Sequence, residues 1–190
     1  MTIIQVRGTS GSGKSTVMRA VMKQLGEFHG VTVAGRKQPM YYQLDWRHGS
    51  SKPVGFDLCV LGHYATACGG CDTIGSAKAV IELIDSMKHW DVILCEGLLL
   101  SEDVKNTLTL PIDRLKVLFL TTPLDTCLER IKGRRATAGN DKPLNVANTS
   151  NRVATIERAR ARLEDAGVFC RMATSEQAPS VIMAWLQQVK

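Results

Sequence analysis

A glycine-rich segment near the start of the chain reads Gly8-Thr9-Ser10-Gly11-Ser12-Gly13-Lys14-Ser15-Thr16. It matches the pattern G-x-x-x-x-G-K-[ST], in which backbone N–H groups curl around one phosphate and the lysine reaches the outer phosphates. An apolar run at 2–7 precedes it and a helical pattern at 14–28 follows it. The pattern requires this strand-then-helix context, because the positive end of the helix dipole faces the anion. The segment therefore predicts a site for ATP or GTP, with the Ser15 hydroxyl as a ligand of Mg²⁺.

Apolar runs alternate with helical patterns along the rest of the chain, which favours a parallel sheet with helices on both faces. We expect one domain over residues 1–190, with a three-layer α/β fold and a parallel sheet of about five strands. The expected strands are 2–7, 31–35, 91–95, 115–120 and 168–172. Two further extended runs, joined by a turn-rich link, suggest a hairpin insertion over 39–61. Later helices are expected at 74–89, 124–132, 149–166 and 179–189.

The 190 residues include 24 Lys and Arg against 18 Asp and Glu, a net charge of +6. Two basic segments, 1–52 and 129–171, flank an acidic middle. This pattern is either ordinary surface charge or two surfaces that converge on a polyanion, such as nucleotide phosphates or nucleic acid. The sequence has no apolar run of the roughly 18 residues that a membrane span needs and no secretory leader pattern. We therefore expect a cytoplasmic protein that does not bind a membrane, with reduced cysteines.

Two carboxylates are candidates for the chemistry of phosphoryl transfer. The apolar run at 91–95 is followed by Glu96 and a glycine, and the ligand edge of a parallel sheet lies at such strand ends. We expect Glu96 beside Mg²⁺, or as the base that accepts a proton from the attacking hydroxyl. Asp72, in a glycine-rich loop, is the other candidate base, and Asp45 is a third. The sequence does not decide among them.

A basic cluster follows the run at 115–120 and contains Arg130, Arg134 and Arg135. The polar residues after it, which include glycine and proline, suit a mobile lid over 130–148. We expect Arg130 and Arg134 to neutralise charge on the transferred phosphoryl group and Arg135 to bind the nucleotide. The plain alternative is a solvated helix face.

The loop at 62–73 is too polar and glycine-rich for a core segment. Its Cys68-x-x-Cys71 pair suggests zinc, but no second pair at a suitable spacing accompanies it. We interpret the loop as part of an acceptor site that includes Gly70 and Cys71, with its glycines allowing a close backbone approach. Asp72 would orient the acceptor hydroxyl, and Tyr64 would stack on a ring. A structural loop in which Asp72 caps a helix is the alternative.

These features resemble the P-loop kinase superfamily, in its nucleoside and nucleotide kinase branch, over nearly the whole chain. Four segments narrow the resemblance: Gly35-Arg36-Lys37-Gln38-Pro39, Gly62-His63-Tyr64 with residues 68–74, Glu96-Gly97-Leu98, and Asn140-Asp141-Lys142-Pro143-Leu144-Asn145. Together they are similar to phage-encoded 5-hydroxymethyluridine DNA kinases of thymidine hypermodification, which phosphorylate the 5-hydroxymethyl group of a uracil in DNA.

The resemblance implies ATP as the donor, Mg²⁺ as the cofactor and DNA with a hydroxymethylated pyrimidine as the partner, in the cytoplasm of a phage-infected bacterium. It also implies that Arg36 binds the substrate. Two other functions stay open. A kinase of free nucleosides, nucleoside monophosphates or another small metabolite would bind its acceptor with little dependence on salt. A nucleotide-dependent regulatory protein would change its partner affinity and phosphorylate no acceptor.

Overall fold

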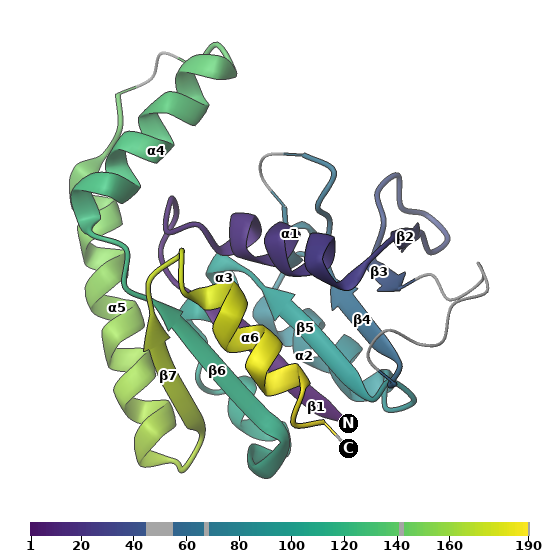
Figure 1. Ribbon diagram of the computed structural model, residues 1–190. Coiled ribbons are helices and arrows are strands. Elements are labelled where there is room, and N and C mark those ends of the chain that lie inside the picture. Colours follow the sequence, from purple (N-terminus) through teal and green to yellow (C-terminus); the bar gives the residue numbers. More distant parts are fainter. Residues whose placement is uncertain (45–54, 67–68, 141–142, 190) are drawn as a thin grey trace.

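The computed structural model describes residues 1–44, 55–66, 69–140 and 143–189, and a central sheet dominates it (Figure 1). The strands are β1 (Thr2–Arg7), β2 (Phe28–Val31), β3 (Tyr41–Leu44), β4 (Leu58–Leu61), β5 (Val92–Glu96), β6 (Leu115–Leu120) and β7 (Phe169–Ala173). The helices are α1 (Lys14–Leu25), α2 (Ala77–Ser86), α3 (Leu98–Glu102), α4 (Leu124–Thr137), α5 (Val146–Asp165) and α6 (Ala178–Leu186). Short 3₁₀ turns occupy Cys71–Ile74, Thr107–Thr109 and Ile112–Arg114.

The seven strands lie in the order β2-β3-β4-β5-β1-β6-β7. The α/β architecture with a mostly parallel sheet is confirmed, but the expected count of about five strands is too low. Strands β4, β5, β1, β6 and β7 pair in parallel, and β2 and β3 add an antiparallel edge. β3 and β4 form the expected antiparallel pair. However, β4 also pairs with β5, so it belongs to the main sheet rather than to an insertion.

Alternate residues of the central strands face opposite helical layers, as the two-residue period of a strand requires. Ile3 and Ile93 belong to a core with residues of α2, α3 and α5. Ile4 and Leu94 belong to a second core with residues of α1 and α6. Figure 1 shows α1 and α6 together in front of the sheet, with α2 behind it. Burial on both faces explains why β1 and β5 read as nearly continuous apolar runs.

A buried arginine ends β1, directly before the glycine-rich segment. Arg7 is fully buried, and its Nε and Nη2 donate to Gln5 Oε1 at 3.0 and 2.6 Å. Nη2 also donates to Thr107 Oγ1 and Nη1 to the Asp103 carbonyl, each at 2.6 Å. Burial lowers the pKa of Arg7 to about 10. The network ties the end of β1, and with it the start of the loop at Gly8, to the segment that follows α3.

Several loops, including the glycine-rich segment, lie together at one edge of the sheet. The connections that follow β1, β4, β5, β6 and β7 all leave from the carboxyl ends of parallel strands. The β2–β3 connection lies at the same edge, because β3 runs antiparallel to β4 and Tyr41 pairs with Leu61. α4 projects away from this edge in Figure 1. Within the described ranges, no helix is both long and apolar enough to span a bilayer.

Candidate active site

The glycine-rich segment forms a tight loop between β1 and α1. Gly11 has φ +79°, and a Cβ there would lie 2.4 Å from the carbonyl oxygen of Cys127 in α4. Only glycine fits this close approach. The hydroxyls of Thr9 and Ser12 are buried, and neither has a hydrogen-bond partner among the residues that the structure describes. The first N–H groups of α1 also lack intrahelical acceptors, so the loop is a concave set of donors suited to an anion.

Lys14 is enclosed by the same loop and is 7% exposed. Its Nζ donates to the carbonyls of Gly8 at 2.9 Å and Thr9 at 3.0 Å. Burial lowers the pKa of Lys14, and the negative charge of Glu96 opposes that shift. The ammonium group is therefore held at the centre of the loop, on the side that faces the end of β5.

Glu96, the last residue of β5, is 1% exposed and accepts a hydrogen bond from Ser15 Oγ at 2.7 Å. Burial raises the pKa of Glu96, while the Lys14 ammonium and the Ser15 hydrogen bond act in the opposite direction. The hydroxyl and the carboxylate are both hard oxygen ligands, and together they suit Mg²⁺, which binds through one or two protein oxygens and several waters. The residues present therefore fit the predicted metal.

Gly70 covers Glu96 from the loop that follows β4. It has φ +76°, and a Cβ at this position would lie 2.2 Å from Glu96 Oε1. Gly62 in turn packs against Gly70, where its Cβ would lie 2.2 Å from the Gly70 carbonyl carbon. The two glycines let this loop lie directly over the carboxylate. We expected the glycines to let an acceptor come close to the backbone. In the structure, the side chain of Glu96 makes that close approach to Gly70.

Replacing Gly70 should therefore damage the site as well as the fold. We expect Gly70→Ala to lower phosphoryl transfer about 100-fold, because the methyl group displaces the Glu96 carboxylate, and to lower the thermal unfolding midpoint. Gly167→Ala is the matched control: Gly167 has φ +84°, but a Cβ there would meet nothing within 4 Å. Steady-state kinetics and thermal unfolding of both variants provide the comparison. If Gly70→Ala were as active as Gly167→Ala, the close contact between Gly70 and Glu96 would not matter for catalysis.

Asp72 lies beside this carboxylate in the 3₁₀ turn after Gly70. Its Oδ2 accepts from the N–H of Leu98 at 2.9 Å and its Oδ1 from the N–H of Leu99 at 3.1 Å. These bonds hold the carboxylate against the start of α3. Each oxygen keeps a second lone pair, so Asp72 can still accept a proton or a hydrogen bond from a bound hydroxyl.

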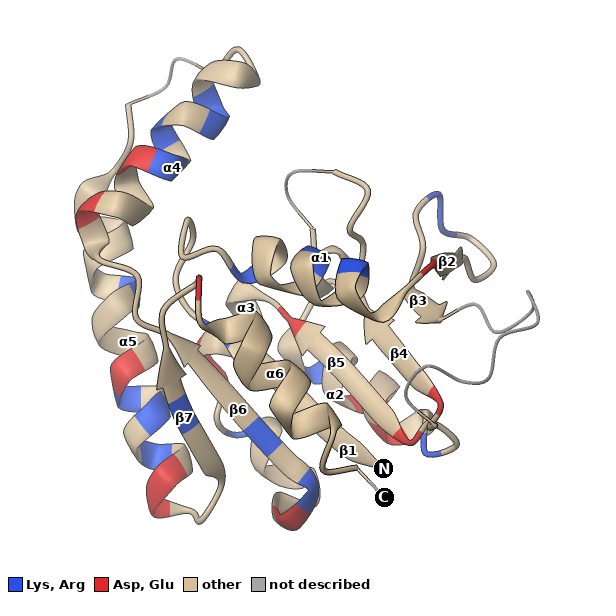
Figure 2. Cartoon of the chain, in the orientation of Figure 1, with Lys and Arg blue, Asp and Glu red and all other residues tan. Residues whose placement is uncertain are grey.

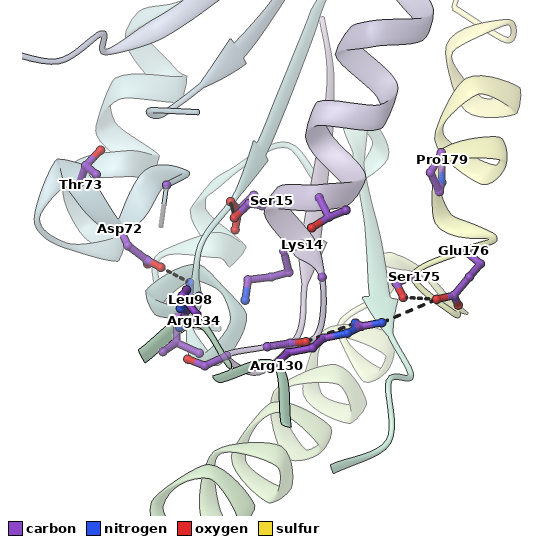
Figure 3. Close-up of a pocket in the computed structure, with 16 residues that line it drawn as sticks. Lys14, Ser15, Asp72, Thr73, Leu98, Arg130, Arg134, Ser175, Glu176 and Pro179 are labelled. Carbon is purple, nitrogen blue, oxygen red and sulfur yellow. Dashed lines mark hydrogen bonds and ion pairs between the residues drawn. The ribbon is translucent and has the colours of Figure 1, made fainter. Parts of the chain in front are cut away.

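A cavity of about 810 Å³ joins these groups (Figure 3). Its lining includes predicted site residues from four separate elements: Ser10, Gly11, Gly13, Lys14, Ser15, Thr16, Asp72, Glu96, Arg130 and Arg134. Gly69, Thr73 and Leu98 line the end beside Asp72. The fold thus brings the glycine-rich loop, both carboxylates and two lid arginines to one cavity.

Eight predicted site residues do not line this cavity: Gly8, Thr9, Ser12, Arg36, Tyr64, Gly70, Cys71 and Arg135. The Tyr64 ring is buried and packs edge-on against Tyr42 with centroids 5.9 Å apart, and Cys71 is buried in a core. Arg135 donates to the Pro143 carbonyl at 3.3 Å, and Arg36 donates to the Thr73 carbonyl at 3.1 Å.

Two other predicted residues, Asp45 and Cys68, lie outside the described residues. No cluster of His, Cys, Asp and Glu able to hold a metal is found in the part of the chain that the structure describes.

The opposite end of the cavity is lined by Ser175, Glu176 and Pro179, which sequence reasoning missed. In Figure 3, Arg130 extends toward this group, and its Nη2 lies 3.8 Å from Glu176 Oε1. Arg130 Nη1 also donates to the Gly11 carbonyl at 3.3 Å. The available signal was positional, because residues that follow the last parallel strand reach the same sheet edge as the loop.

The raised pKa of Glu96 has a consequence for stability. The folded protein binds this proton more readily than the unfolded chain, so the carboxyl favours folding at low pH and this contribution is lost as pH rises through the folded pKa. In metal-free buffer, we expect the unfolding free energy of the wild type, relative to Glu96→Gln, to fall as pH rises from 4.5 toward neutrality. Urea unfolding of both proteins across this range measures it. A flat or rising difference would mean that burial does not disfavour this carboxylate.

Comparison with known proteins gives similar sequences and similar solved structures. No family model matches the chain. A protein named 5-hmdU DNA kinase from Pseudomonas phage PaMx11 is 40% identical over 170 residues, with 87% of each chain covered. A second 5-hmdU DNA kinase, from Pseudomonas phage M6, is 29% identical over 177 residues, with 84% of each covered. The solved structure of deoxyadenosine kinase from M. mycoides, with products dCMP and a flexible dCDP bound, matches with a TM-score of 0.53. It covers 99% of this chain and 100% of that one at 12% identity, which supports the fold alone.

Proposed function

The chain belongs to the family of 5-hmdU DNA kinases, and from that membership and the cavity geometry we propose its reaction. The γ-phosphoryl group of ATP is transferred to the hydroxyl of a 5-hydroxymethyluracil base in DNA. The enzyme is therefore a phosphotransferase with an alcohol acceptor, and the whole chain acts as one kinase domain. The proposed setting is the cytoplasm of a phage-infected bacterium, where phage DNA is made.

The observation that carries the proposal is the single cavity shared by the glycine-rich loop and Asp72. Donor phosphates and an acceptor hydroxyl must meet in line for phosphoryl transfer, and a shared cavity makes this possible. The loop residues and Ser175, Glu176 and Pro179 form the donor end. Gly69, Asp72, Thr73 and Leu98 form the acceptor end. Glu96 lies between the two ends, beside Ser15.

The donor phosphates bind to the loop amides and to Lys14. The ammonium group carries a full positive charge into a site largely shielded from water, where it stabilises charge that develops on the outer phosphates. Ser15 and Glu96 would hold Mg²⁺. When bound, the metal neutralises phosphate charge and helps to orient the γ-phosphoryl group. Arg130, held by the Gly11 carbonyl and Glu176, lies on the donor side.

Asp72 is the proposed base. Glu96 is engaged by Ser15 and covered by Gly70, whereas Asp72 lines the acceptor end and is oriented by two N–H groups of α3. The acceptor hydroxyl donates its proton to Asp72 as it attacks the γ-phosphorus. Arg134 also lines the cavity and supplies positive charge to the transferred group. A base stacked within a duplex cannot reach this point, so the target nucleotide must leave the helix.

A phosphate-transfer assay with γ-labelled ATP and Mg²⁺ tests the proposal. The acceptors are duplex DNA with 5-hydroxymethyluracil, the same duplex with thymine, and a pool of free nucleosides and nucleoside monophosphates. Label on the hydroxymethylated duplex alone is expected. Label on a small molecule instead would identify a metabolite kinase, and nucleotide binding without any labelled acceptor would favour a regulatory protein.

A further inference from the structure

The β2–β3 connection carries two adjacent cations, Arg36 and Lys37, at the sheet edge where the cavity opens. The register of β3 on β4 places this connection beside the loop that follows β4. The side chain of Arg36 crosses to that loop, where its Nη2 donates to the carbonyl of Thr73 at 3.1 Å. Thr73 lines the acceptor end of the cavity. The guanidinium group of Arg36 is thus fixed at the border of the acceptor end.

A third cation approaches the same loop from α1. Arg19 Nε donates to the Tyr64 carbonyl at 3.1 Å, and its Nη2 donates to the Thr66 carbonyl. A backbone bridge between His63 and Gly70 closes the part of the loop that Arg19 contacts. Arg19 and Arg36 therefore both bind the loop at 62–73, Arg19 near its start and Arg36 at its end. Carbonyls take only part of the five N–H donors of each guanidinium, so both groups keep donors for a further anion.

These cations lack the carboxylate partners that other basic residues have. Lys78 in α2 lies 3.6 Å from Glu82, and Lys88, just after α2, lies 3.0 Å from Asp85. Within the described ranges, no carboxylate is within ion-pair distance of Arg19, Arg36 or Lys37. Figure 2 shows Lys and Arg on α1 and on the β2–β3 connection, with acidic residues at the carboxyl end of β5 as well as at the opposite ends of β4 and β5. In the described part of the chain, these three cations therefore have no carboxylate within ion-pair distance, although Asp72 and Glu96 lie at the same edge.

From this placement we propose that Arg36, Lys37 and Arg19 form the docking surface for the phosphodiester backbone of the acceptor DNA. They bind phosphates that flank the extruded nucleotide, while its base enters the cavity past Thr73. The inference deepens the proposed function and rests on it. Planar guanidinium groups suit bidentate contacts with phosphate, and Lys37 adds a point charge. Such contacts position the strand without reading its sequence.

Salt-dependent binding to duplex DNA tests the surface. For the Arg36→Gln/Lys37→Gln variant, we expect weaker binding and a slope of log affinity against log salt that is smaller by about 0.9 for each lost phosphate contact. Thymine and 5-hydroxymethyluracil duplexes should lose affinity equally. Lys37→Gln alone should show about half of the change in slope, and it leaves the Arg36–Thr73 contact in place. The matched control is Lys78→Gln/Lys88→Gln, which removes the same charge from α2 and the turn that follows it, and should keep the wild-type slope.

The outcomes separate this inference from the proposed function. An unchanged slope in both test variants, an equal loss in the α2 control, or no DNA binding by the wild type would overturn the docking surface. A wild type that binds duplex through these residues yet transfers no phosphate to 5-hydroxymethyluracil would support the surface and contradict the proposed reaction. Phosphate transfer to 5-hydroxymethyluracil by the wild type, with an unchanged salt slope in the test variants, would support the proposed reaction and contradict the docking surface.

Discussion

Lys14→Ala should lower the rate of phosphoryl transfer by about 10²–10³-fold while leaving the fold intact. The loss is large because the ammonium group acts inside a site shielded from water, where one electrostatic contact to the transition state is worth several kcal/mol. The fold should survive, since the variant loses two hydrogen bonds to loop carbonyls but also the cost of burying a charge. Single-turnover kinetics at saturating ATP measures the chemical step directly.

The control for this variant is Lys78→Ala, which removes an exposed lysine of α2 that pairs with Glu82. It should retain wild-type kinetics. Circular dichroism and the thermal unfolding midpoint establish that both variants are folded. Near-full activity of a folded Lys14→Ala protein would contradict the kinase mechanism itself, because no other buried lysine lies in the loop.

Glu96→Gln should have an effect of similar size by a different route. The amide keeps the shape of the side chain and can still accept from Ser15, but it removes the negative charge next to that hydroxyl. We expect kcat to fall about 10²–10³-fold, because the charge that orients and holds the metal is lost. The Mg²⁺ concentration for half-maximal activity should rise, and ATP binding without metal should change little.

Glu102→Gln is the matched control, since Glu102 lies at the end of α3 and pairs with Arg152 at 2.9 Å, outside the main cavity. It should show wild-type Mg²⁺ dependence. If Glu96→Gln lost activity with an unchanged Mg²⁺ requirement, Glu96 would act as the base, and the assignment of that role to Asp72 would be wrong.

Local patterns predicted the central elements of the fold well. The strands at 2–7 and 115–120 match β1 and β6, because strands buried on both faces are mostly apolar in sequence. The expected strand at 31–35 was wrong, since β2 occupies Phe28–Val31 and forms only through pairing with β3. The helix expected at 124–132 is longer than predicted: α4 continues through Gly133 to Thr137, because one exposed glycine costs a helix only about 1 kcal/mol.

For the site as well, prediction succeeded where the residues are adjacent in the sequence and failed where their contacts are distant in it. The loop around Lys14 is contiguous, so its residues and their spacing are visible in the sequence. Arg7 shows the opposite case: a basic residue in an apolar run gives no hint that Gln5, Asp103 and Thr107 will satisfy it. The aromatic ring of Tyr64 was assigned to substrate, but Tyr42 packs against it through a strand pairing that the sequence does not display.

The position of β1 in the sheet also determines the order in which the chain can fold during synthesis. β1 is made first, yet its partners are β5 and β6, so Thr2 pairs with Val92 and Ile3 with Leu115. β1 therefore has no partner strand, and its apolar side chains stay exposed, until about half of the chain has left the ribosome. Such distant pairings slow folding and leave an aggregation-prone segment exposed in the meantime. High-level production should therefore benefit from slow translation or chaperone supply, which protect the nascent first strand until its partners emerge.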